Sequence, residues 1–99
     1  MASYHLTLKA VDDLKNIWEY TFENWSEKQA DYYYITLIET CTLIANSPQI
    51  GKNYEGIVKS LFGLIINHRI IFYRQISDDK VEIIRILHER MDLIKNIEK

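Results

Sequence analysis

The stretch HRIIFYRQISDDKVEIIRILHERMD, residues 68–92, decides the fold of this chain. It predicts two strands, 69–76 and 81–88, joined by a polar turn at residues 77–80. Both predicted strands are apolar on both faces, and an isolated strand pair of this kind is at best marginally stable in water. We therefore expect most of the remaining chain to cover this hairpin, and we expect functional residues among its charged positions.

The N-terminal half predicts one strand followed by two helices. Residues 4–8 alternate between apolar and polar, as in a short strand, and from about Lys9 to Trp25 the apolar residues recur at helical spacing. Ser26 can cap a second helix, with Gln29 completing a capping box. Pro48 marks its end near residue 46. The two helices are expected to form an antiparallel hairpin.

The remaining segments complete a single domain over residues 1–99. Residues 49–56 predict a loop, 57–66 a strand containing Gly63, and 67–68 a turn. Three-residue spacing of apolar side chains predicts a short C-terminal helix (Met91, Ile94 and Ile97). The expected fold is α+β, in the order β-α-α-β-β-β, with an antiparallel sheet packed against the helical hairpin. Helices on one side would bury only one face of that sheet, leaving the other to the C-terminal segment or to a partner.

Composition limits the classes of function. The chain has 99 residues and a net charge of −2, whereas a generic nucleic-acid-binding domain is strongly basic. No apolar run is long enough to span a membrane, and the first residues lack the apolar core of a signal peptide, so we expect a cytoplasmic protein. Cys41 is the single cysteine, which excludes an intrachain disulfide; we expect a packed thiol. His5 and His68 show no metal-ligand spacing.

Two groups of residues are candidates for binding. Surplus apolar side chains of the second helix (Tyr32, Ile35 and Leu43) fall outside its main apolar stripe. Basic side chains of the final strands could converge at one end of the sheet and bind an anion, nucleic acid or an acidic partner (Arg69, Arg74, Arg85, His88 and Arg90). The alternative is that Arg74 and Arg85 pair with nearby acids such as Glu82 and cover the sheet with their stems.

Motifs along nearly the whole chain resemble the ParE toxins of bacterial type II toxin–antitoxin modules, known also as plasmid stabilisation proteins. The motifs are A-x-x-D-L-x-x-I-W-x-Y-T (10–21), W-S-x-x-Q-A (25–30), I-A-x-x-P-x-x-G (44–51), H-x-I-I-F-Y-R (68–74) and V-E-I-I-R-I-L-H-x-R-M-D (81–92). The resemblance implies the RelE/ParE superfamily fold, which agrees with the expected order of elements.

The resemblance also implies a ParD-type antitoxin as partner, and DNA gyrase as target of a toxin that performs no catalysis. We expect no cofactor, no metal and no direct sequence-specific binding of nucleic acid. The related RelE branch cuts messenger RNA on the ribosome, and Arg74, Arg85 and His88 could form such a catalytic trio; the isoelectric point of about 5.9 disfavours this alternative. A third hypothesis is an inactive homologue that only binds its antitoxin. The oligomeric state stays open, a homodimer included.

Basic residues such as Arg74 and Arg85 are expected to meet acidic antitoxin side chains. An amphipathic antitoxin helix would lie on the apolar set Tyr32, Ile35 and Leu43, with an added edge strand as a further possibility.

Overall fold

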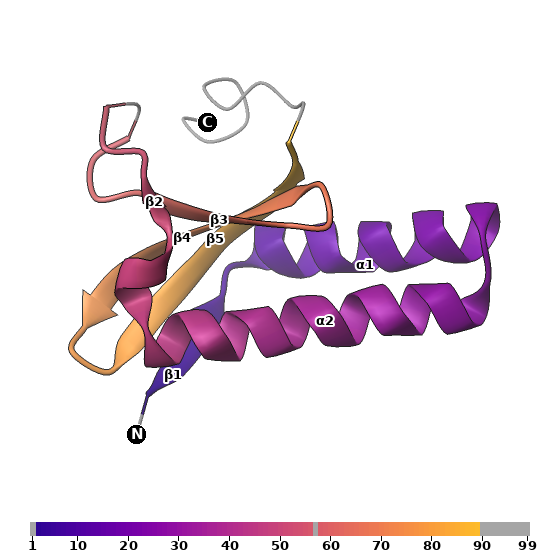
Figure 1. Cartoon of the computed structure of the whole chain (residues 1–99), viewed down its shortest axis with the longest axis horizontal. Helices are drawn as coiled ribbons and strands as arrows, with labels where there is room; N and C mark the ends of the chain where they lie inside the picture. The colour runs from indigo at the N-terminus through magenta and orange to yellow at the C-terminus, as the bar shows by residue number, and fades with distance from the viewer. Residues whose placement is uncertain (1, 57, 90–99) are drawn as a thin grey trace.

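The computed structural model describes residues 2–56 and 58–89, and these form two helices packed on a five-stranded sheet (Figure 1). The elements are β1 (Ser3–Leu6), α1 (Leu8–Asn24), α2 (Glu27–Asn46), the short 3-10 helix Pro48–Ile50, β2 (Lys52–Asn53), β3 (Phe62–Ile66), β4 (Arg69–Ser77) and β5 (Lys80–His88). The α+β class and the helical hairpin predicted from the sequence are confirmed.

Local capping sets the ends of the two helices. The Thr7 hydroxyl accepts a hydrogen bond from the amide of Ala10 at 3.0 Å and begins α1. The Ser26 hydroxyl accepts one from the amide of Gln29 at 3.1 Å and begins α2. Each cap satisfies a backbone donor that the first helical turn leaves without a partner. The predicted break around Trp25 is therefore confirmed, and α1 begins one residue earlier than expected.

The sheet has the order β1-β5-β4-β3-β2. Strands β3, β4 and β5 form the predicted antiparallel meander. However, β1 pairs in parallel with β5, from Ser3 opposite Lys80 to Leu6 opposite Ile83, so the sheet is mixed. The expectation of a wholly antiparallel sheet is wrong at this edge, because the first strand runs alongside the last strand of the chain.

The predicted strand over 57–66 is too long. β3 begins only at Phe62, because the preceding residues turn: Val58 donates its amide to Tyr54 at 3.1 Å, Leu61 donates to Val58 at 3.2 Å, and Ser60 has a φ of 62°. Conversely, the predicted loop contains β2, which pairs with the first two residues of β3. The predicted C-terminal helix lies outside the described residues.

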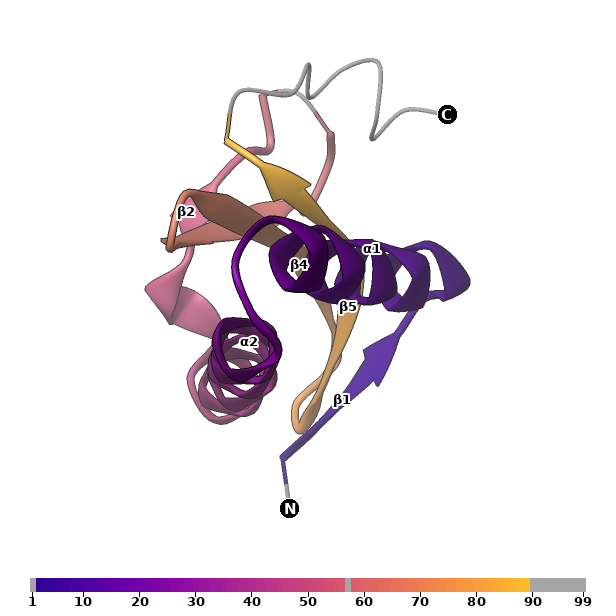
Figure 2. The same ribbon diagram turned by 90° about the vertical axis from the view of Figure 1, so that its right-hand side faces the viewer.

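Both faces of the sheet are covered, by different parts of the chain. The helices cover one face, where Leu14, Ile17, Leu37 and Ile44 pack with Ile71, Tyr73, Ile83 and Ile86 (Figure 2). On the other face the turn residues Tyr54, Val58 and Leu61 pack against Ile70, Phe72 and Leu87. The strands thus carry apolar residues on both faces because each face of the sheet packs in a core of its own. The expected contribution of the C-terminal segment to this second face lies outside the described residues.

Candidate functional site

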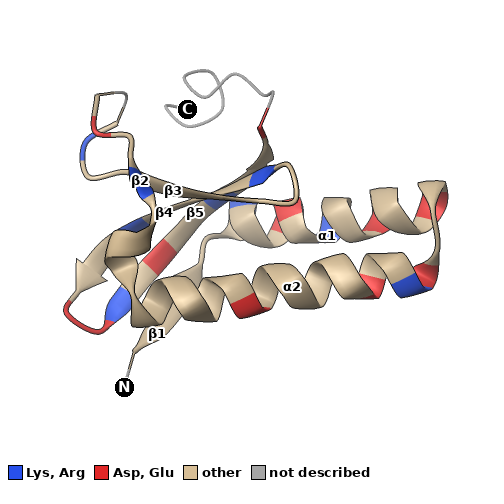
Figure 3. Cartoon of the chain, viewed as in Figure 1, with Lys and Arg blue, Asp and Glu red and all other residues tan. Residues whose placement is uncertain are grey.

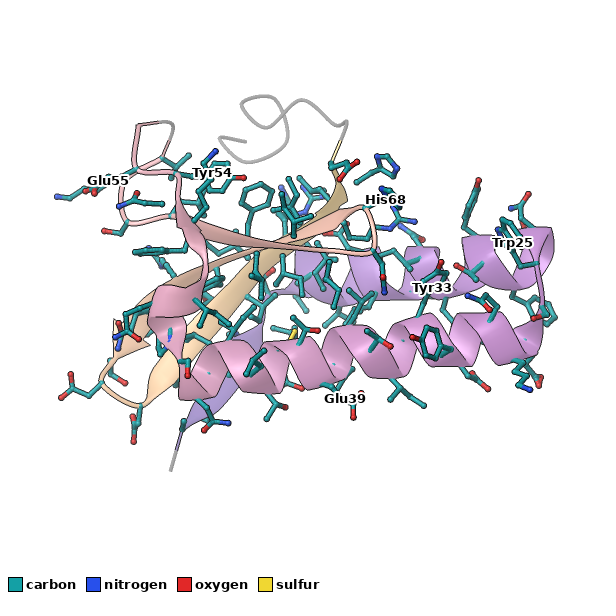
Figure 4. All side chains as sticks on the ribbon, in the orientation of Figure 1. Trp25, Tyr33, Glu39, Tyr54, Glu55 and His68 are labelled. Carbon is teal, nitrogen blue, oxygen red and sulfur yellow. The ribbon has the colours of Figure 1, made fainter. Side chains whose placement is uncertain are left out.

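A groove of about 660 Å³ lies between the helical hairpin and the end of the sheet that carries the β3–β4 turn. Its helical side presents Asn16, Tyr20, Trp25 and Tyr33, and its sheet side presents Asn67, His68, Arg69 and His88. Ile17, Leu37 and Ile86 from the core form part of its lining. In Figure 4, Trp25 follows the end of α1, Tyr33 lies on α2 and His68 lies at the β3–β4 turn. The groove therefore combines aromatic rings on one side with basic and amide groups on the other.

A tight turn places the basic side chains at the groove. Asn67 and His68 connect β3 to β4 with φ angles of 49° and 64°, the left-handed pair that a two-residue hairpin turn requires. The next residue, Arg69, lies opposite His88 in the β4–β5 register. The His68 ring contacts the Glu89 carboxylate at 3.2 Å. The turn at 67–68 predicted from the sequence is confirmed, and it brings Arg69 and His88 together.

Arg85 has a different environment, held against α1 by Asp13. Its Nε lies 2.8 Å from Asp13 Oδ2 and its Nη2 lies 3.0 Å from Asp13 Oδ1, a two-point ion pair. The two side chains are only 16% and 12% exposed. The hydrogen bond with Asp13 raises the pKa of Arg85. The ion pair of Arg85 with Asp13 therefore links β5 to α1.

Asp13 also completes the edge of β5 beyond the end of β1. Its Oδ2 accepts the amide of Ile86 at 3.0 Å, and the Thr7 hydroxyl donates to the carbonyl of Ile84 at 2.7 Å. The pairing of β4 with β5 slips between Phe72 and Tyr73, and this bulge lies at the same place. Side chains of α1 and its cap thus satisfy backbone groups that β1 is too short to reach.

Arg74 lies nearer the other end of β4, which leads into the β4–β5 turn. Charged residues of both signs are spread over the two helices and the sheet (Figure 3). The Nε of Arg74 donates to Glu82 at 3.2 Å, and its side chain is 56% exposed. The five basic positions predicted from the sequence are therefore divided. Arg69 and His88 line the groove, Arg85 pairs with Asp13, Arg74 pairs with Glu82, and Arg90 lies outside the described residues. Of the proposed catalytic trio, Arg74 and Arg85 thus each pair with a different carboxylate, whereas His88 lines the groove.

The predicted apolar set occupies a surface away from the groove. Tyr32, Ile35 and Leu43 are 59%, 55% and 53% exposed. They lie on the side of α2 opposite its buried residues, among them Leu37, Cys41 and Ile44. This outer face of α2 and the groove are thus two separate candidate contact surfaces.

Sequence reasoning missed the aromatic side of the groove and the role of Asp13. Tyr20 lies off the buried stripe of α1, and an aromatic residue at such a position is the sequence signal that could have identified it. In the structure it is 58% exposed. Tyr33 is half-buried at the groove wall. No local pattern identifies Asp13, because its partner is 72 positions away.

Cys41 has no role in either surface. It is fully buried, and burial raises the pKa of its thiol to about 12. The prediction of a packed thiol is confirmed. Within residues 2–56 and 58–89, no group of three His, Cys, Asp or Glu side chains is placed to hold a metal ion, and neither helix is long and apolar enough to cross a membrane.

Comparison with known proteins gives one consistent result. The family described as "ParE toxin of type II toxin-antitoxin system, parDE" matches residues 4–93. Toxin ParE1 of Caulobacter vibrioides is 34% identical over 92 residues, covering 93% of this chain and 94% of the relative. Toxin ParE1 of Mycobacterium tuberculosis (strain CDC 1551 / Oshkosh) is 30% identical over 94 residues, covering 95% and 96%. A solved structure described as "Chromosomal ParDE TA system from P. aeruginosa" shares the fold, with a TM-score of 0.75, 19% identity and coverage of 89% and 96%.

Proposed function

The chain belongs to the ParE toxins of type II toxin–antitoxin systems, and from this premise we propose that it inhibits DNA gyrase and is neutralised by a ParD-type antitoxin. The observation that carries the proposal is the family match over residues 4–93, which includes both the helical hairpin and the sheet. The gyrase target rests on the resemblance in the sequence, since this is the activity by which the family is known.

The distribution of charge supports a non-catalytic toxin over a ribosome-dependent nuclease. The net charge is −2, whereas phosphate contacts supply much of the affinity of proteins that bind RNA. Of the three side chains that a nuclease trio would need, Arg74 is paired with Glu82 and Arg85 with Asp13. Both arginines are thus engaged in ion pairs, with two different carboxylates.

The groove is the proposed contact for the antitoxin. Its aromatic side, Tyr20, Trp25 and Tyr33, suits the apolar side chains of an incoming segment, and Arg69 with His88 suits an acidic residue of that segment. The outer face of α2, with Tyr32, Ile35 and Leu43, is the second proposed contact. Arg74, which is more than half exposed, could meet an acid farther along the antitoxin.

Expression of the chain in bacteria, alone and together with the antitoxin encoded beside it, tests the proposal. We expect growth arrest with the chain alone and normal growth when both are made. Harmless expression of a folded, full-length chain would contradict the proposal and support the inactive homologue. Cleaved messenger RNA in arrested cells would support the nuclease instead.

A further inference from the structure

Helix α1 carries a second apolar stripe that the core does not use. The buried stripe consists of Ala10, Leu14, Ile17 and Thr21. On another face, an outer stripe runs through Leu8, Val11, Lys15, Trp18 and Phe22, of which Leu8, Val11 and Phe22 are 85%, 46% and 48% exposed. Trp18 and Phe22 stack with ring centroids 5.2 Å apart. This surface lies outside both the groove and the outer face of α2.

The spacing of the outer stripe is that of a helix–helix contact. Its residues follow one another at steps of three, four, three and four. Alternating steps of three and four average 3.5 residues, the repeat with which two helices pack along a shared seam. The stripe is therefore patterned to receive another helix.

A shallow hollow of about 470 Å³ adjoins this stripe and gives it a charge preference. Leu14, Lys15, Trp18, Glu19, Asp31 and Tyr34 line it. Asp31 accepts a hydrogen bond from the Trp18 indole at 2.9 Å, which holds a carboxylate beside the ring. Two carboxylates and two aromatic rings against one lysine favour a cationic side chain from the incoming helix.

We propose that the outer stripe of α1 binds a second copy of this chain, with the two α1 helices antiparallel. In an antiparallel pair, the two kinds of seam position face each other, so that Val11 faces Phe22 of the second copy. The same register places Lys15 opposite Trp18 of the second copy. The single cation of the stripe thus reaches the aromatic and acidic hollow of the other chain, and the arrangement is reciprocal.

The expected strength follows from the size of the surface. An aromatic side chain buries about 150–250 Å² when fully covered, so the partly exposed side chains of both stripes bury on the order of 1,000 Å² in total. This is the lower end of specific interfaces, and we expect dissociation in the micromolar range. The inference does not depend on the identity of the toxin's target.

Sedimentation equilibrium of the purified full chain tests the proposal. We expect a reversible shift to twice the monomer mass at micromolar concentration. Phe22→Glu should raise the dissociation constant at least tenfold, whereas Ile76→Glu is the matched control, because Ile76 is equally exposed (50%) but lies on β4. A monomeric chain throughout the micromolar range, or an equal effect of both variants, would overturn the proposal.

Cysteine cross-linking tests the antiparallel geometry. We expect a mixture of Val11→Cys and Phe22→Cys chains to form an interchain disulfide under mild oxidation. Val11→Cys alone should form little, because the two copies of residue 11 lie roughly 16 Å apart along the helix axis in this register. The native Cys41 is buried and does not compete. Efficient cross-linking of Val11→Cys alone would rule out this register. If the chain is monomeric and only the antitoxin shields the stripe from solvent, the stripe belongs to the antitoxin interface and the proposal is overturned.

Discussion

Asp13 joins α1 to β5 through three hydrogen bonds, two to the Arg85 guanidinium and one to the amide of Ile86. Replacing one member of a buried ion pair leaves the other charge without compensation, which is typically costly. We expect Asp13→Ala to lower the free energy of unfolding by about 3 kcal/mol, measured by urea denaturation.

The exposed pair Arg74–Glu82 provides the comparison. Its arginine is 56% exposed, and exposed pairs contribute little because water screens them. Arg74→Ala should therefore cost less than about 1 kcal/mol. The double variant Asp13→Ala with Arg85→Ala should recover part of the loss, since no single charge then stays buried. Equal effects of Asp13→Ala and Arg74→Ala would contradict the assigned roles.

The raised pKa of the Cys41 thiol predicts that the free energy of unfolding falls at alkaline pH. Burial raises the pKa of the thiol from 9.0 to about 12, so between these values the folded chain holds a proton that the unfolded chain releases. The contribution of the protonated Cys41 thiol to the free energy of unfolding is fully present below pH 9 and is lost as the pH rises toward 12. Unfolding measured across this range should show a shallower decline for Cys41→Ala than for the natural chain. The raised pKa values of Tyr4 and Tyr73 act in the same direction and persist in the variant. Identical slopes would contradict this account of Cys41.

Among the elements, β3 depends on the absence of a side chain at Gly63. A Cβ there would lie 2.8 Å from the Tyr54 ring and 3.0 Å from Ile70. Overpacking of this kind costs about 1–3 kcal/mol, and we expect Gly63→Ala to lower the free energy of unfolding by that amount. Gly56 is the matched control, because a Cβ there meets nothing within 4 Å. A Gly63→Ala variant as stable as Gly56→Ala would contradict this account, because it would show that Tyr54 and Ile70 can move to make room for the added Cβ.

The groove predicts which charge the antitoxin needs. We expect Arg69→Glu to weaken antitoxin binding at least tenfold, because it places a carboxylate where an acidic partner residue is proposed to lie. Isothermal titration calorimetry measures this loss, and it should shrink at high salt. Lys59→Glu changes the same charge on the exposed turn before β3 and should bind normally. Unchanged affinity of Arg69→Glu would remove this end of the groove from the proposed interface.

The elements differ in how well the sequence predicts them. Both helices, the Ser26 cap of α2 and the β3–β4–β5 meander follow from local spacing, capping residues and short turns. The parallel pairing of β1 with β5 and the two-residue β2 depend on contacts between distant segments, which no local pattern encodes. The candidate site divides in the same way. The turn at Asn67 and His68 could be predicted, whereas the pairing of Asp13 with Arg85 required the fold.

For the whole molecule, the family and the arrangement of charge lead to one account. The chain is a ParE-type toxin in which Arg74 and Arg85 form ion pairs with Glu82 and Asp13, and in which Arg69 and His88 line the groove that we propose as the antitoxin contact. Such a molecule would act by binding its target and would need no catalytic trio. Gyrase inhibition is thus the central claim.

A gyrase supercoiling assay with the purified chain tests this claim most directly. The account predicts loss of supercoiling and accumulation of gyrase-cleaved DNA as the chain is added, both reversed when the antitoxin is added first. Unchanged supercoiling, with no cleaved DNA at micromolar concentrations of folded chain, would contradict it.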